Sequence, residues 1–130
     1  MKFSTKSQYG LRGMVYLACH EDRIVSLKEI SEKENIPFDY SEKIFSKLEK
    51  ANLIETKRGA TGGYFLARKA NKIKIGEIVR ALEEGFPSVK CLYGEECPQE
   101  EKCLTKSFWS KIYTSLNKSL DSMTLKDLIK

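Results

Sequence analysis

The chain has 130 residues, enough for one domain with a substantial core and too few for a multidomain machine. Its composition, 41% hydrophobic and 32% charged, is typical of a soluble globular protein, and no stretch has the ~20 apolar residues that a membrane span requires. The net charge is +5, and residues 1–72 hold the whole excess, with 14 basic and 9 acidic side chains. The first half is therefore expected to face a polyanion.

The chain has four cysteines and one histidine, and these counts limit the chemistry that it can perform. The N-terminus is polar where a secretory signal would be apolar, so we expect a cytoplasmic protein with reduced thiols, which favours metal ligands or core thiols over disulfides. Cys19 falls at the end of an apolar helical stripe, which predicts a buried thiol. His20 is expected to be an exposed helix-end side chain. No catalytic triad surrounds it, and no enzyme is indicated.

Hydrophobic periodicity predicts three helices in the first half of the chain. The first covers residues 4–21. The second begins at Ser26, which has the spacing of a capping box with Glu29, and ends before Pro37. The third covers about residues 39–52, and its expected buried side chains are Ile44, Phe45, Leu48 and Ala51.

The outer face of the third predicted helix is polar and carries Lys43, Ser46 and Lys47, whose donors suit phosphates and base edges. Two short helices joined by a tight turn match a helix-turn-helix, in which the second helix enters the major groove. A solvated face of an ordinary helical bundle would show the same pattern.

Residues 53–67 change to a strand pattern around a glycine-rich turn, which predicts a β-hairpin. Lys57 and Arg58 lie at its tip, where they can reach a minor groove or its phosphates. A nucleotide-binding loop is disfavoured, because the segment lacks the GK[ST] ending and no helix follows it. A helix-turn-helix followed by a basic hairpin indicates a DNA-binding winged helix.

The second half of the chain predicts a helix over 75–84 and a longer one over 107–121. The first three helices already supply a winged-helix core, so we expect the apolar stripe of the long helix to pair two chains rather than to pack within one. That stripe consists of Trp109, Ile112, Tyr113, Leu116 and Leu120. Thr124 and Asp127 predict a short capped turn at the end.

Cys91, Cys97 and Cys103 form a C-x5-C-x5-C array between these two helices. Thiolates gathered in one loop bind iron–sulfur clusters, zinc or copper(I). Zinc sites usually have shorter cysteine spacings and four protein ligands, so the spacing favours an iron–sulfur cluster. Zinc and redox-active thiols remain alternatives.

Four segments closely resemble the IscR-type winged-helix transcription regulators: residues 1–6, 40–48, 58–64 and 103–109. The likeness covers nearly the whole chain. It implies a mostly α fold with a small β-wing, in which a long C-terminal helix dimerises two winged helix-turn-helix units. It also implies a homodimeric bacterial repressor that senses iron–sulfur, redox or nitric oxide status. The cysteine array would bind the cluster, and the third helix and the wing would bind DNA.

The fourth cluster ligand is open, because Lys106 stands where the cluster-assembly regulators have histidine, and a protonated ammonium cannot ligate. Other members use a carboxylate near the N-terminus, where this chain has Gln8. We expect a 2Fe–2S rather than a 4Fe–4S cluster. A zinc-stapled or thiol-based regulator is the alternative.

We divide the single expected domain into a DNA-binding part (1–72), a helix with the cysteine loop (73–106) and a dimerisation part (107–130). The expected partners are a second copy of the chain and a palindromic DNA operator, with no membrane. The candidate DNA-contacting residues are Ser26, Tyr40, Ser41, Glu42, Lys43, Ser46, Lys47, Lys57, Arg58, Gly59 and Thr61.

Overall fold

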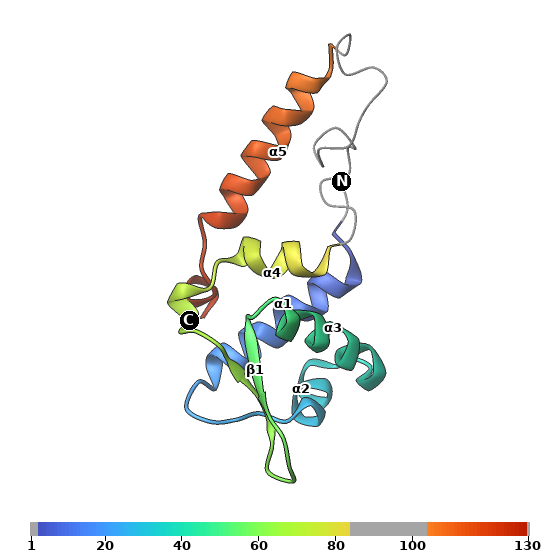
Figure 1. Cartoon of the computed structure of the whole chain (residues 1–130), viewed down its shortest axis with the longest axis vertical. Coiled ribbons are helices and arrows are strands. Elements are labelled where there is room, and N and C mark those ends of the chain that lie inside the picture. The colour runs from blue at the N-terminus through green and yellow to red at the C-terminus, as the bar shows by residue number, and fades with distance from the viewer. Residues whose placement is uncertain (1–2, 84–103, 130) are drawn as a thin grey trace.

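The computed structural model describes residues 3–83 and 104–129 (Figure 1). The fold is mostly helical with a small antiparallel wing, as predicted. A long helix, α5, extends away from the body on the side opposite the wing tip (Figure 1). The elements in chain order are α1 (Thr5–Cys19), α2 (Leu27–Glu34), α3 (Phe38–Lys50), β1 (Ile54–Lys57), β2 (Gly63–Leu66), the 3-10 turn η1 (Ala70–Lys72), α4 (Ile75–Leu82), α5 (Lys106–Asp121) and the 3-10 turn η3 (Leu125–Leu128).

Local signals define the helix-turn-helix. Ser26 caps α2, because its Oγ accepts a hydrogen bond from the Glu29 amide at 3.1 Å. The turn between α2 and α3 passes through Asn35 in the left-handed conformation (φ 54°). Asn52 adopts the same conformation (φ 61°) after α3, as expected of a residue that ends the helix. The second half of the predicted capping box is not seen, since the Glu29 carboxylate binds Tyr16 and Arg23 instead.

The wing is a two-stranded antiparallel hairpin in which Ile54 pairs with Leu66 and Lys57 with Gly63. The extended link before α2 joins its edge: Val25 and Tyr64 exchange two backbone hydrogen bonds of 3.0 and 2.7 Å. A Cβ on Gly63 would overlap the Val25 carbonyl, so this close approach requires glycine. The base of the wing is thereby fixed to the helix-turn-helix.

One hydrophobic core joins the helices and the base of the wing. Two burial predictions are wrong. Ala51 is exposed because it follows the last turn of α3 as the C-cap residue. Cys19 is exposed because the inward stripe of α1 runs through Met14 and Leu17, and a residue two positions beyond Leu17 points to the other side.

The two helices of the second half differ in burial. On α4 the predicted inward residues Ile75, Ile78, Val79 and Leu82 are buried. On α5 no residue is buried, and the helix is held at its C-terminal end by hydrogen bonds from Arg80 to Asp121 (2.7 Å) and Asn117 (2.8 Å). After α5 the chain returns to the body, where Leu125 is buried; the predicted cap is present, with the Thr124 amide donating to Asp127 at 2.8 Å.

Candidate nucleic-acid interface

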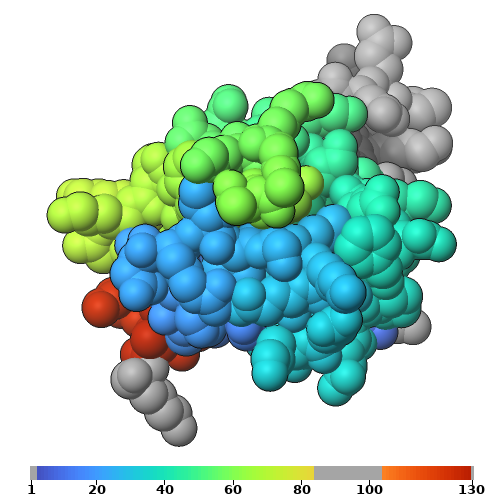
Figure 2. Space-filling view, turned by 90° about the horizontal axis from the view of Figure 1, so that it is seen from below, coloured from blue at the N-terminus to red at the C-terminus, as the bar shows by residue number. Residues whose placement is uncertain are grey.

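One face of the molecule combines the structural parts that the sequence suggested for DNA binding. Seen from the wing-tip end, the wing, α2 and α3 lie side by side on this face (Figure 2). We call it the winged face, and define it by the exposed side chains of α2, α3 and residues 57–61. Such a surface offers both a helix for a major groove and a hairpin for the adjoining groove or backbone.

The surface of α3 divides into a core side and a solvent side. Residues Ile44, Phe45 and Leu48 are buried, which fixes the rotation of the helix about its axis. The solvent side contains the candidates Glu42, Lys43 and Ser46. Positions four residues apart lie along one row of a helix, so the exposed residues Phe38, Glu42, Ser46 and Lys50 form a continuous row.

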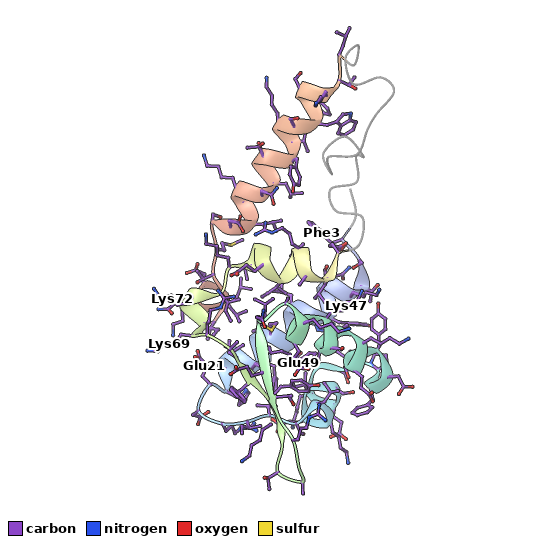
Figure 3. All side chains as sticks on the ribbon, in the orientation of Figure 1. Phe3, Glu21, Lys47, Glu49, Lys69 and Lys72 are labelled. Carbon is purple, nitrogen blue, oxygen red and sulfur yellow. The ribbon has the colours of Figure 1, made fainter. Side chains whose placement is uncertain are left out.

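Three other α3 candidates have different surroundings. Ser41 is fully buried and its hydroxyl donates to the Phe38 carbonyl at 2.7 Å, so its side chain is not on the exposed face, and its contact with DNA stays a prediction. Tyr40 is half-buried and its ring packs edge-to-face on Tyr9, with centroids 5.6 Å apart. Lys47 is also half-buried and lies beside the start of α1, away from the wing tip (Figure 3).

The wing tip exposes every candidate that the sequence placed there: Lys57, Arg58, Gly59 and Thr61. The turn is closed by a hydrogen bond of 3.0 Å from the Gly62 amide to the Gly59 carbonyl. Gly59 has φ +113°, which L side chains rarely adopt, so glycine is required at this point of the tip. The remaining candidate, Ser26, is exposed at the start of α2 but already serves as its cap.

A polar cluster missed by the sequence analysis fixes α2 to α1. The Glu29 carboxylate accepts two hydrogen bonds from Arg23, at 2.5 and 2.9 Å, and one from the Tyr16 hydroxyl at 2.5 Å. The hydrogen bonds from Arg23 and then Tyr16 lower the pKa of Glu29 to about 2. His20 stacks on Tyr16 at 4.4 Å and is therefore partly covered. The spacing of these residues across a loop follows no helical pattern.

A second unpredicted contact joins the end of α4 to the start of α1. The Glu83 Oε1 accepts hydrogen bonds from the Ser4 amide at 2.5 Å and from the Ser7 hydroxyl at 2.7 Å. Burial opposes ionisation of Glu83, but the bonds from Ser7 and Ser4 outweigh it and lower the pKa. Because α4 also packs against α3, this contact links the chain before residues 84–103 to the winged face.

The predicted cluster ligands Cys91, Cys97 and Cys103 lie outside the described residues. Over residues 3–83 and 104–129, no group of three histidine, cysteine or acidic side chains is placed to hold a metal ion. Lys106 is the first residue of α5, and Gln8 is exposed, with its amide donating to the Phe3 carbonyl at 3.3 Å. Over the same ranges no helix has the length and apolar character needed to cross a membrane.

Comparison with known proteins gives the family. The Rrf2 family, described as an iron-dependent transcriptional regulator, matches residues 3–130. Protein rrf2 of Nitratidesulfovibrio vulgaris is 39% identical over 134 residues, covering all of this chain and 88% of that protein.

Two solved structures have the same fold. IscR of T. potens is 40% identical with a TM-score of 0.79, and the match covers 99% of this chain and 86% of that one. CymR, the global cysteine regulator of B. subtilis, is 37% identical with a TM-score of 0.78, and the match covers 98% of this chain and 95% of that one. Members of this family are transcription regulators, not enzymes, in agreement with the sequence. The chain belongs to the Rrf2 family and is an IscR-like transcriptional regulator.

Proposed function

We propose that this protein is a cytoplasmic homodimeric repressor that binds a palindromic operator and senses iron–sulfur, redox or nitric oxide status through a 2Fe–2S cluster on Cys91, Cys97 and Cys103. The observation that carries the DNA-binding half is the winged face itself. A polar helix surface and a cationic hairpin tip lie on one side of the molecule, fixed there by the same core (Figure 2).

The exposed groups of the winged face fit the grooves and backbone of DNA. On α3 the Glu42 carboxylate can accept from a cytosine amino group, and Lys43 can donate to guanine or phosphate. The Ser46 hydroxyl can donate or accept a hydrogen bond and can therefore contact either kind of base edge. At the tip, Lys57 and Arg58 would meet the minor groove or its phosphates, with Gly59 and Thr61 close to the backbone.

The surface of α5 supports the proposed dimer. Phe108, Trp109 and Ile112 are 53%, 40% and 40% exposed in the single chain, and none of the sixteen residues of this helix is buried. Pairing two such helices would remove this apolar surface from water and would fix the separation of two α3 helices. Successive major-groove half-sites lie one duplex turn, about 34 Å, apart, which is why a palindrome is expected.

The donor chemistry of the cysteine array supports the sensor half. Three thiolates in one segment are suitable ligands for an iron–sulfur cluster, which would supply a redox-sensitive and nitric oxide-sensitive group. The array lies in sequence between α4, which packs on α1 and α3, and α5. A change in that segment would therefore act on the helix that spaces the two winged faces.

The test begins with the full chain purified without oxygen and analysed for iron, sulfide, zinc and visible absorption. A sequence selected from a random duplex library then serves as the operator in binding titrations with loaded and stripped protein. We expect iron and sulfide to be bound and the two affinities to differ. If Cys97→Ser loses the bound iron and sulfide and also the difference in affinity, while Cys19→Ser keeps them, the result would support the cysteine array as the cluster-binding site. Equal affinities would refute the sensor half.

A thiol-based regulator is the second candidate, favoured by the likeness to CymR, which is described as a cysteine regulator. Such a protein would contain no metal and would lose free thiols on oxidation. A zinc-stapled form would be colourless with one zinc per chain. The same metal analysis and a thiol titration before and after peroxide treatment separate these cases.

A further inference from the structure

Phe38 is an aromatic side chain left in solvent at the start of α3. It is 46% exposed, although the same helix buries Phe45 completely. A single exposed apolar residue is ordinary on a protein surface, so the exposure of Phe38 carries weight only through its position on the winged face.

The surroundings of Phe38 form a shallow hollow on the winged face. The hollow has a volume of about 380 Å³ and is lined by Lys28, Ser31 and Glu32 of α2 together with Phe38. The surface that lines it is largely apolar, although Lys28 and Glu32 carry charges. In the view from the wing tip, α2 and α3 lie on the same face as the wing (Figure 2).

The position of Phe38 within α3 places it among the candidate base-reading residues. It is the first residue of the helix and lies one turn before Glu42 in the exposed row. The first turns of a recognition helix usually contact base edges. The Ser41 hydroxyl donates to the Phe38 carbonyl, which holds this turn in place.

We propose that Phe38 contacts the C5 methyl group of a thymine in the major groove, next to the base read by Glu42. This inference rests on the proposed function, since it requires α3 to enter that groove. Of the four bases, thymine alone presents a methyl group in the major groove, and phenylalanine is a suitable apolar partner for it. Phe38 thus makes the operator thymine-specific at one position of each half-site.

The experiment uses the selected operator and copies in which each thymine is replaced in turn by 2′-deoxyuridine, which lacks only the methyl group. Binding of wild-type protein, Phe38→Ala and Phe38→Leu is measured by fluorescence anisotropy. We expect one symmetric pair of replacements to weaken wild-type binding by about fourfold per half-site, the value of one buried methyl. Phe38→Ala should lose the methyl effect, and Phe38→Leu should keep most of it.

Two results would overturn the inference. One is that no deoxyuridine replacement weakens wild-type binding. The other is that the replacement and Phe38→Ala weaken binding independently, as would follow if Phe38 only covered the hollow or bound another protein. Thermal unfolding of both variants checks that they fold. If wild-type protein selects no sequence at all, the proposed function fails; if it selects an operator without a methyl effect, only the role of Phe38 fails.

Discussion

The Glu83 carboxylate accepts a hydrogen bond from the Ser7 hydroxyl at 2.7 Å and so joins the end of α4 to the first turn of α1. The same oxygen accepts the Ser4 amide at 2.5 Å. A carboxylate at a helix N-terminus compensates both its free amides and its dipole. The contact stabilises the fold at the last described residue before the segment 84–103.

We predict that Glu83→Ala lowers the free energy of unfolding by about 2 kcal/mol, because the nearly buried Ser7 hydroxyl loses its acceptor. Glu83→Gln should lower it by about half as much, since an acceptor remains and only the charge is lost. Urea denaturation at fixed protein concentration measures both values. Glu55→Gln, an exposed carboxylate on β1, is the control and should change little. Equal stability of Glu83→Ala and the control would contradict this role.

The Glu29 cluster should make stability depend on pH in the acid range. Its pKa is lowered from 4.5 to about 2 by the Arg23 and Tyr16 hydrogen bonds, so the folded state favours the carboxylate. This contribution is fully present above about pH 4.5 and is lost as the pH falls toward 2. Glu29→Gln should therefore reduce the loss of melting temperature over that interval. An acid limb as steep as that of wild type would show that other carboxylates dominate it.

Two glycines of the wing should respond differently to alanine. Gly63→Ala forces a Cβ against the Val25 carbonyl, and we expect a loss of about 1–3 kcal/mol in stability. Gly59→Ala meets open space but must adopt φ +113°, and we expect a smaller loss with a rearranged tip. Ala60→Ser at the same tip is the control. Chemical denaturation measures the change in the free energy of unfolding. An unchanged stability of Gly63→Ala would mean that the backbone around Val25 can move to accommodate the Cβ.

The sequence predicted those features that depend on neighbouring residues. Ser26 as a cap and Asn52 as a stop follow from local backbone chemistry, and the structure confirms both. The partners of Glu83 lie 76 and 79 positions away, so only the packed fold brings them together. Cys19 was misplaced because one apolar stripe can be drawn at two rotations of a helix, and the choice depends on what packs against it.

Within the candidate site the limit is the same. The exposed face of α3 was predicted because its polar residues alternate with a strong apolar stripe. Ser41 shares the polar character of that face but lies on the core side, where its hydroxyl is satisfied by the Phe38 carbonyl. Residue types therefore predict that α3 has a polar face. Which polar residues lie on that face depends on how the helix is rotated against the core.

Arg58 at the wing tip should contribute to the affinity of DNA binding and to its salt dependence. If it contacts only phosphate, Arg58→Ala should weaken binding to all sequences and reduce the slope of log K against log salt by about 1. If it reads a base, the loss should be about 1–3 kcal/mol and confined to the operator. Titrations at several salt concentrations on operator and random duplexes distinguish the two. Lys118→Ala, the same charge lost from α5, should leave the slope unchanged.

The exposed stripe of α5 should hold the dimer together. Ile112 is 40% exposed in the single chain, and burying it in a pair of helices would remove apolar surface from water. Ile112→Glu would place a charge in that interface, so we expect a monomer by sedimentation and much weaker operator binding. Lys111→Glu places the same carboxylate at an exposed neighbouring position, with a charge change of −2 rather than −1, and should remain dimeric. A dimeric Ile112→Glu protein would mean that another surface joins the two chains.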